Sequence, residues 1–331
     1  MTATVPPYRP PRWLRNGHVQ TVYASLFRRV EGVAYRRERI DLEDGDFLDL
    51  DWLGRGRRVA VVAHGLEGSA DRSYVRGMAA ELHRQGWAVC AWNLRGCSGE
   101  PNRLLRAYHS GATDDLEAVV SHVLEGGAEA VAVLGFSLGG NLTLRWLGEN
   151  GDALDRRVIA GAGVSVPVDL ASSAETMKAW SRRLYMRYFL RKLAVKVEEK
   201  ASRFPDAPDP AGVSRMTSFA EFDGVFTAPV HGFASAQDYW ARASSRPVLD
   251  QIRVPTVLVN ALDDPFLSAS CYPSEKAEAN PNLTLLAPRW GGHVGFVTAS
   301  GPYWSEVAVG RHLEVALRRE GLGAAFDGEQ E

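Results

Sequence analysis

Short runs of consecutive apolar residues alternate along this chain with longer stretches of helical periodicity. The apolar runs cover residues 58–63, 87–92, 131–134, 158–161, 256–260 and 283–286. Helix-compatible stretches cover 74–85, 113–124 and 304–319, and the residues after Asn141 also have a helical pattern. Strands that are apolar throughout are buried on both faces, and helices between them supply the crossovers that parallel strands need. The pattern therefore predicts an α/β fold with a mostly parallel central sheet flanked by helices.

One part of the chain interrupts this alternation. From about residue 171 to 203 the sequence is helix-prone and rich in Lys and Arg, and a mixed, Pro-rich segment continues to about 238. We interpret residues 169–238 as a helical cap inserted between two parts of the core, which are 1–168, with an N-terminal extension 1–40, and 239–325. A peripheral helical pair remote from any site is the alternative. The cap aromatics are expected to form an apolar inner face over a pocket, and they are Trp180, Tyr185, Tyr188, Phe189, Phe222 and Phe226.

The apolar run 131–134 ends abruptly in Gly135-Phe136-Ser137-Leu138-Gly139. A Gly-x-Ser-x-Gly sequence between a strand and a helix is typical of a nucleophile elbow, a strained turn whose neighbouring positions must lack bulk. The turn lifts the serine Oγ clear of the sheet. It also places the N–H of Leu138 at a helix N-terminus, where it can bind a developing oxyanion. We therefore predict that Ser137 is a nucleophile.

A serine nucleophile needs a base, and the base needs a third group that orients it. In α/β-hydrolases these partners follow the serine in the order acid, then histidine. Only His231, His293 and His312 follow Ser137 in the chain. His312 lies in the helical pattern 304–319, and His231 precedes the best candidate acid. His293, in a Gly-rich loop directly after a strand, is the predicted base, and a structural histidine in a turn is the alternative.

The acid is expected after the late apolar run 256–260, where Asp263-Asp264-Pro265 offers two carboxylates. We predict Asp264, because the Asp-Pro sequence makes a rigid turn and the position matches the usual Asp-x-apolar pattern. Asp263 is the alternative.

A second oxyanion donor is expected from the loop Ala63-His64-Gly65-Leu66. Gly65 allows the backbone to turn, so that the N–H of Leu66 can face the same point as the N–H of Leu138. His64 is expected to brace this loop. No phosphate-binding glycine motif accompanies these residues, and the mechanism needs neither a metal nor an organic cofactor.

The composition excludes several classes of protein. The chain has 331 residues, a net charge of −2 and no overall basic excess for a nucleic acid or an anionic membrane. Arginine pairs such as Arg28-Arg29 and Arg182-Arg183 are interpreted as solvated faces. The three cysteines, Cys90, Cys97 and Cys271, have no metal-ligand spacing, and Cys97 is expected to be a bystander thiol. The N-terminal residues lack a secretory signal pattern, and no apolar stretch has spanning length. We expect a cytoplasmic protein without stable membrane insertion.

Seven segments, taken together and in this order, resemble the YheT-like hydrolases and their eukaryotic α/β-hydrolase-domain relatives. They are Asn16-Gly17-His18-Val19-Gln20-Thr21, His64-Gly65-Leu66-Glu67-Gly68, Asn93-Leu94-Arg95-Gly96-Cys97-Ser98-Gly99, Tyr108-His109-Ser110-Gly111, 135–141, 260–266 and 291–296. The resemblance implies an α/β-hydrolase fold and carboxylic-ester hydrolysis, with Ser137, Asp264 and His293 in the triad positions. This chain has Asn16-Gly17 where the family's variant has asparagine-proline, and the resemblance assigns no role to that segment.

The function predicted from these observations is a serine hydrolase that acts on a small-molecule acyl ester or a lipid. Two other functions use the same residues or the same fold. An acyltransferase or thioesterase would use the same triad with an alcohol or a thioester, and a catalytically silent binding protein would keep only the fold. The sequence does not specify the acyl chain, the head group or the oligomeric state.

Overall fold

The computed structural model of the chain describes residues 5–322. Its centre is an eight-stranded sheet in the order β1-β2-β4-β3-β5-β6-β7-β8. The pairs β1/β2 and β2/β4 are antiparallel, and the other neighbouring pairs are parallel. This arrangement confirms the predicted α/β fold. The strands are β1 (Arg36–Asp41), β2 (Phe47–Leu53), β3 (Arg58–Ala63), β4 (Ala88–Asn93), β5 (Ala130–Phe136), β6 (Val158–Val164), β7 (Thr256–Val259) and β8 (Leu283–Leu286).

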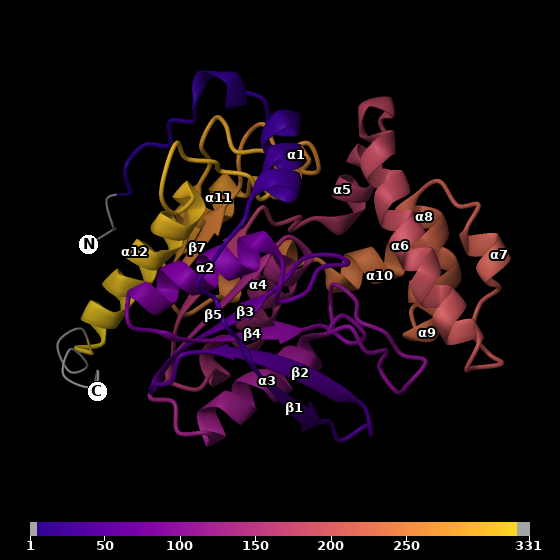
Figure 1. Cartoon of the computed structure of the whole chain (residues 1–331), viewed down its shortest axis with the longest axis horizontal. Coiled ribbons are helices and arrows are strands. Elements are labelled where there is room, and N and C mark those ends of the chain that lie inside the picture. Colours follow the sequence, from indigo (N-terminus) through magenta and orange to yellow (C-terminus); the bar gives the residue numbers. More distant parts are fainter. Residues whose placement is uncertain (1–4, 323–331) are drawn as a thin grey trace.

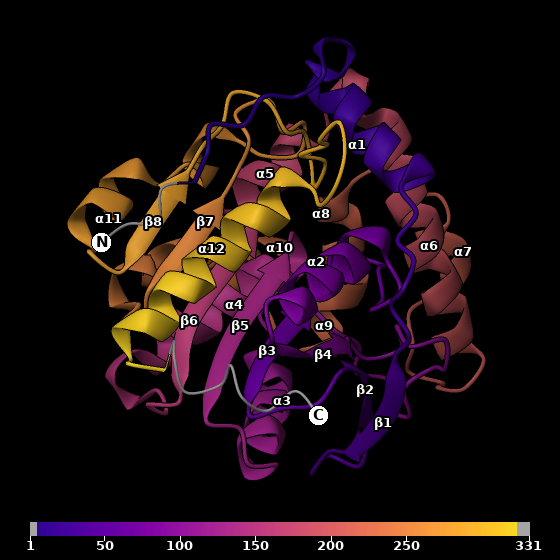
Figure 2. The same cartoon turned by 60° about the vertical axis from the view of Figure 1, so that its left-hand side comes forward.

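Helices cover both faces of the sheet (Figures 1 and 2). The helices α2 (Ser73–Arg84) and α12 (Trp304–Arg319) pack on one face, and α3 (Thr113–Glu125) and α4 (Leu138–Asn150) pack on the other. The shorter α11 (Ser274–Ala279) precedes β8, and α1 (Gly17–Phe27) precedes the sheet. No helix within residues 5–322 is long and apolar enough to cross a membrane.

The central strands are apolar because each of them contributes side chains to two separate cores. On β3, Val59, Val61 and Ala63 pack toward α3 and α4, whereas Ala60 and Val62 pack toward α2 and α12. Successive side chains of a strand point to opposite faces, so a strand covered on both sides must be apolar at every position. The carboxyl ends of β3 and β5 consequently lie side by side, and both of their following loops reach the same edge of the sheet.

The antiparallel hairpin of β1 and β2 is the part of the sheet that the apolar runs did not predict. β1 begins at Arg36, inside the segment interpreted as an N-terminal extension. Its arginines pair across the strands with buried aspartates of β2: Arg37 binds Asp51 through two hydrogen bonds of 2.8 and 2.9 Å, and Arg39 binds Asp49 through two of 2.7 and 2.9 Å. These cross-strand pairs take the place of apolar contacts on one face of the hairpin.

A group of helices is inserted between β6 and β7, and Figure 1 shows it gathered on one side of the molecule, beyond the carboxyl ends of the strands. The segment interpreted as a cap, 169–238, contains most of this group. The elements are α5 (Leu170–Thr176), α6 (Arg183–Ala201), α7 (Pro210–Val213), α8 (Phe219–Phe222), a π-helical turn Asp223–Thr227, α9 (Ala228–Val230) and α10 (Ala236–Ala243). Short 3₁₀ turns cover Arg12–Leu14, Gly151–Ala153, Trp180–Arg182, Arg246–Gln251 and Ala269–Cys271.

Candidate active site

Ser137 stands on a sharp turn between β5 and α4. Its backbone has φ +51° and ψ −116°, a conformation that costs a non-glycine residue about 1–3 kcal/mol. A Cβ on Gly135 would lie 2.2 Å from the carbonyl oxygen of Gly139, and one on Gly139 would lie 2.4 Å from that of His64. Both glycines are therefore required for the chain to turn this tightly between the strand and the helix.

The structure brings Ser137, His293 and Asp264 into one hydrogen-bonded row. The Oγ of Ser137 lies 2.9 Å from Nε2 of His293, and Nδ1 of His293 lies 2.9 Å from Oδ2 of Asp264. Because the carboxylate can only accept, Nδ1 carries a proton and Nε2 is free to accept the serine hydroxyl. The carboxylate of Asp264 also accepts from the N–H of Phe266 at 2.9 Å, which fixes its orientation.

The adjacent carboxylate, Asp263, has a different partner. Its Oδ1 accepts a hydrogen bond of 2.8 Å from the N–H of Gly292, so it supports the loop that carries His293 without contacting the imidazole. Burial raises the pKa of Asp263. The two candidate acids of the sequence thus point to different groups, and Asp264 is the one paired with His293.

The N-terminal helix α1 holds the histidine loop from the other side. The Oγ1 of Thr21 accepts a hydrogen bond of 2.8 Å from the N–H of His293 and donates one of 2.7 Å to the carbonyl of Gly17. A Cβ on Gly17 would lie 1.9 Å from the carbonyl oxygen of Asp263, so only glycine allows this approach. The motif to which the resemblance assigned no role therefore packs against the loop between β8 and α12. Sequence reasoning missed Thr21, because its partner is 272 residues away.

Replacing Thr21 by valine is expected to lower kcat about tenfold and leave KM unchanged. Valine has nearly the same shape but leaves the N–H of His293 without an acceptor, and a lost hydrogen bond of this kind costs about 1–3 kcal/mol. Thr21→Ser keeps the hydroxyl and is expected to retain most of the activity. Steady-state kinetics with a soluble ester compare the two variants, and equal rates for both would contradict a positioning role for the hydroxyl.

Two backbone N–H groups belong to residues that line the same cavity as Ser137. They belong to Leu138, the first residue of α4, and to Leu66, in the loop after β3, and both residues line the cavity. Neither N–H has an acceptor among residues 5–322, whereas the neighbouring N–H of Gly65 donates to the Tyr74 hydroxyl at 3.0 Å. Free donors beside a serine hydroxyl can stabilise negative charge on a carbonyl oxygen that the serine attacks.

His64 braces this loop from beneath. Its Nδ1 donates to the carbonyl of Gly65 at 2.8 Å, and its Nε2 accepts from the N–H of Leu94 at 3.1 Å. Complete burial lowers the pKa of His64 to about 3. The imidazole is therefore neutral at physiological pH, and both of its ring nitrogens are occupied by backbone groups.

Glu67 connects the same loop to helix α6. It has a φ of +53°, and its carboxylate lies 3.1 Å from the Nζ of Lys196 and accepts a hydrogen bond of 2.6 Å from the Tyr108 hydroxyl. The Nζ of Lys196 also lies 2.9 Å from the Sγ of Cys97. Burial raises the pKa of the Cys97 thiol, which makes it a weak nucleophile at neutral pH. The ion pair thus links the inserted helices to the loop of Leu66.

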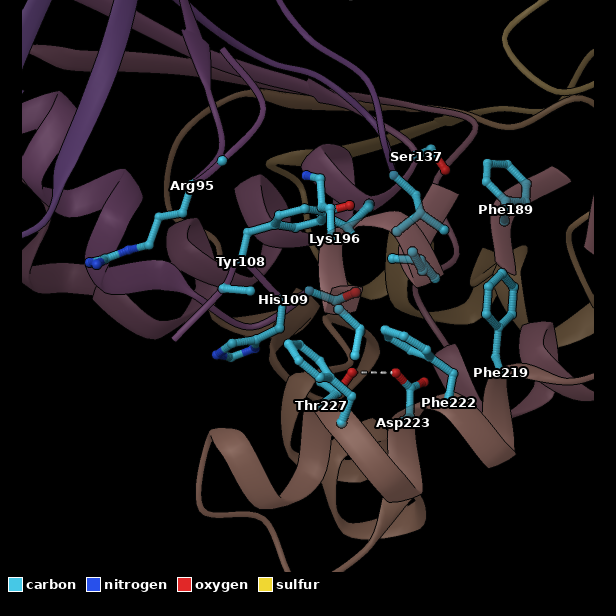
Figure 3. Close-up of a pocket in the computed structure, with 18 of the residues that line it drawn as sticks. Arg95, Tyr108, His109, Ser137, Phe189, Lys196, Phe219, Phe222, Asp223 and Thr227 are labelled. Carbon is cyan, nitrogen blue, oxygen red and sulfur yellow. Dashed lines mark hydrogen bonds between the residues drawn. The ribbon is translucent and has the colours of Figure 1, made fainter. Parts of the chain in front are cut away.

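Ser137 and His293 open into a cavity of about 360 Å³ between the sheet and the inserted helices. Figure 3 shows Ser137 on one side of this cavity and Phe222, Asp223 and Thr227 on the opposite side. Its walls are mainly apolar, with Leu170, Met177, Phe189, Leu193, Phe219 and Phe226 among them. A cavity of this kind suits an acyl chain better than a polar group.

Asp223 places a carboxylate at the far end of this apolar cavity, and no motif in the sequence signalled it. Its Oδ1 accepts from the Thr227 hydroxyl at 2.7 Å and its Oδ2 from Nε1 of Trp240 at 2.8 Å. Burial raises the pKa of Asp223 to about 6. Thr227 lies in the π-helical turn of the insertion and Trp240 lies on α10. The carboxylate of Asp223 therefore connects two elements of the far wall.

The aromatic residues expected on the inner face of the cap divide into three groups. Phe189, Phe222 and Phe226 line the cavity as predicted. Trp180 is 82% exposed and Tyr188 is also exposed, so the prediction was wrong for these two. Tyr185 packs between His18 of α1 and Phe266. Helical spacing shows which residues share a face, but it does not show which face is covered.

No group of three or more metal-ligating side chains occurs within the part of the chain that the structure describes.

Comparison with known proteins identifies the class to which this fold and site belong. The family model described as the alpha/beta hydrolase fold matches residues 61–300. The chain therefore belongs to the α/β-hydrolase family. Within it, the chain is 36% identical over 297 residues to YheT of Escherichia coli (strain K12), which covers 87% of this chain and 86% of YheT. The resemblance to YheT-like hydrolases is thereby confirmed.

A second relative and a solved structure extend this comparison. Phospholipase ABHD3 of Mus musculus is 32% identical over 308 residues, covering 89% of this chain and 74% of that protein. The structure of a Pyrococcus furiosus esterase superimposes with a TM-score of 0.56 at 18% identity, over 87% of this chain and 91% of that one. At this identity the esterase supports the fold alone. The chain is a hydrolase by family.

Proposed function

We propose that this chain is a serine carboxylic-ester hydrolase that acts through an acyl-enzyme with Ser137, Asp264 and His293 as its catalytic triad. The observation that carries the proposal is the row of two 2.9 Å hydrogen bonds from Ser137 through His293 to Asp264, placed beside two N–H groups without acceptors. A nucleophile, a base, an orienting acid and oxyanion donors are the components that acyl transfer requires.

The first half of the reaction forms the acyl-enzyme. His293 accepts the hydroxyl proton of Ser137 as Oγ attacks the ester carbonyl, and Asp264 stabilises the imidazolium that results. The N–H groups of Leu66 and Leu138 donate to the oxyanion of the tetrahedral intermediate. His293 then gives its proton to the leaving alcohol. In the second half, water repeats the same sequence on the acyl-enzyme and releases the acid.

The cavity supports acyl esters or lipids as the substrate class. Its apolar walls and its volume of about 360 Å³ fit a hydrocarbon chain that begins at Ser137. One relative is named a phospholipase, which is a name for enzymes that hydrolyse lipid esters, and this agrees with the proposed substrate class. The inserted helices supply most of the wall, so we propose that residues 169–238 are a cap that selects the acyl chain.

Hydrolysis and acyl transfer are separated by one experiment. Rapid mixing with p-nitrophenyl acetate is expected to give a burst of one nitrophenolate per enzyme, followed by turnover, since the acyl-enzyme accumulates. Repeating the reaction with added methanol or glycerol measures how the acyl group divides between water and alcohol. Preferential transfer to the alcohol would favour an acyltransferase with the same triad, and the absence of any reaction with esters or fluorophosphonates would contradict the proposal.

The acyl-chain preference is expected to change when the cavity is enlarged. Phe222→Leu removes part of the wall, so the ester with the highest kcat/KM should be longer by one or two methylene groups. Each methylene in an apolar pocket is worth about 1–3 kcal/mol, so the change should be graded. A series of p-nitrophenyl esters of increasing chain length measures it.

Trp180→Leu is the matched control for this change, because Trp180 lies on the same insertion but outside the cavity. Its chain-length profile should equal that of the unmodified protein when the esters are soluble monomers. Both variants should still react with a small fluorophosphonate. Identical profiles for Phe222→Leu and Trp180→Leu would argue that the insertion does not select the acyl chain.

A further inference from the structure

Exposed apolar side chains are concentrated on α1, on α6 and on the 3₁₀ turns that precede them. Among the described residues eleven large apolar side chains are exposed, and nine of them lie between Trp13 and Phe27 or between Trp180 and Val195. Leu26 of α1 is 69% exposed and Leu184 of α6 is 80% exposed. Scattered single apolar residues on a surface are ordinary, but a contiguous patch marks an interaction site.

The two helices lie next to each other, so their exposed side chains form one face. The ring of His18 on α1 stacks on Tyr185 of α6 with centroids 5.8 Å apart, and Nδ1 of His18 lies 3.2 Å from the Tyr185 hydroxyl. Figure 2 shows α1 and α6 running along the same side of the molecule. On α1 the buried residues occupy one side of the helix, and Val19, Val22 and Leu26 occupy the opposite side. We call this combined surface the α1–α6 face.

All the acidic and basic residues in the two segments that form the α1–α6 face are basic. Residues 5–30 contain five arginines and no acidic residue, and residues 176–197 contain seven lysines and arginines and no acidic residue. On α6, Arg183, Arg187 and Arg191 are exposed, and none of the three forms an ion pair with another described residue. The net charge of −2 for the whole chain hides this separation. The interpretation of these arginines as merely solvated was based on the overall charge.

We propose that the α1–α6 face docks on the surface of an anionic lipid bilayer. Apolar side chains flanked by arginines are the composition of a helix that lies in the interface of a membrane, with the apolar residues among the acyl chains and the cations beside the headgroups. A protein partner would need acidic residues to match Arg183, Arg187 and Arg191, whereas an anionic bilayer presents negative charge at every position. The face binds lipid without any helix crossing the membrane.

The α1–α6 face extends to the rim of the cavity. Leu184, Tyr188 and Val195 follow one side of α6, and Val195 is both exposed and part of the cavity lining. At 1.5 Å per residue the stripe from Leu184 to Val195 is about 16 Å long. Docking would therefore bring the rim of the cavity to the bilayer. This inference rests on the proposed function, because docking on a bilayer would bring an enzyme that hydrolyses lipid esters to its substrate.

Binding can be measured without turnover. The Ser137→Ala protein is sedimented with sucrose-loaded vesicles of phosphatidylcholine alone or mixed with phosphatidylglycerol, at low and high salt. We expect binding to the mixed vesicles that weakens with salt and little binding to phosphatidylcholine alone. Since the serine is absent, this result does not depend on whether the chain hydrolyses esters.

Two double variants test the two components of the face in the same background. Arg183→Glu with Arg187→Glu is expected to lower the partition coefficient at least about 25-fold, since each cation near an anionic surface is worth about fivefold. Leu26→Asp with Leu184→Asp removes one apolar anchor from each helix and should lower it at least about tenfold. Val225→Asp with Arg156→Glu makes the same kinds of change at exposed positions elsewhere and should leave binding intact.

Three results would overturn the proposal. They are no binding to the mixed vesicles, equal loss of binding in the control variant, and a self-associated chain that Leu26→Asp with Leu184→Asp converts to a monomer while vesicles bind neither form. The last result would assign the face to a second copy of this chain, and sedimentation velocity detects it. Hydrolysis of p-nitrophenyl acetate by the same substitutions in the Ser137 protein verifies that each variant is folded.

Discussion

Ser137→Ala is expected to lower kcat for ester hydrolysis about 10⁶-fold and to leave the fold unchanged. The loss is this large because removing a serine nucleophile leaves only the contributions of the oxyanion donors and of substrate binding. The side chain of Ser137 faces the cavity, so its Oγ contributes little packing. Steady-state kinetics with a soluble ester and thermal unfolding measure the two halves of this expectation.

A fluorophosphonate probe provides the control for Ser137. The probe should label the unmodified protein and a Ser121→Ala variant to equal extents, since Ser121 lies on α3 and bonds only Glu117. It should not label Ser137→Ala. Labelling of the alanine variant at another serine, with turnover retained, would show that a different residue is the nucleophile.

Asp264→Asn is expected to lower kcat about 10⁴-fold. An asparagine can donate a hydrogen bond to Nδ1 of His293, which favours the tautomer that carries its proton on Nε2 and cannot accept the proton of Ser137. The shape of the site is preserved, so KM should change much less than kcat. Rates are measured over a range of substrate concentrations to separate the two constants.

Asp263→Asn is the matched comparison, because the two carboxylates are adjacent in the chain and differ in their partners. The amide oxygen of an asparagine at 263 can still accept from the N–H of Gly292, so the loop of His293 should keep its position. We expect a loss far smaller than that of Asp264→Asn. The reverse order would assign the orienting role to Asp263, and two small losses would require an acid from another part of the chain.

The central strands and the elbow could be predicted from the sequence because local patterns determine them. A strand buried on both faces must be apolar throughout, and the turn at Ser137 must have glycine on both sides. The hairpin of β1 and β2 follows neither rule. Its Asp49 and Asp51 are buried only because Arg39 and Arg37 bind them, and neither strand alone shows that the other neutralises it.

The parts of the site that escaped prediction depend on contacts between distant segments. Asp223 reaches the cavity through the folding of the insertion, and its partner Trp240 lies on another helix. The role of Glu67 depends on Lys196 of α6. On α6, the orientation of the helix decided that Phe189 lines the cavity whereas the adjacent Tyr188 is exposed. The helical pattern therefore showed where the insertion lies in the chain, but it did not show which face of its helices packs against the cavity.

The contact between α1 and the histidine loop joins the first part of the chain to the last. During synthesis the elbow of Ser137 and its neighbouring strands can form well before residue 293 leaves the ribosome, whereas contacts of such long sequence separation form late. Thr21 must then remain available until the loop arrives. Until residue 293 has been synthesised, the nascent chain lacks the imidazole that lies 2.9 Å from the Oγ of Ser137, so the hydrogen-bonded row is complete only when these distant segments have met.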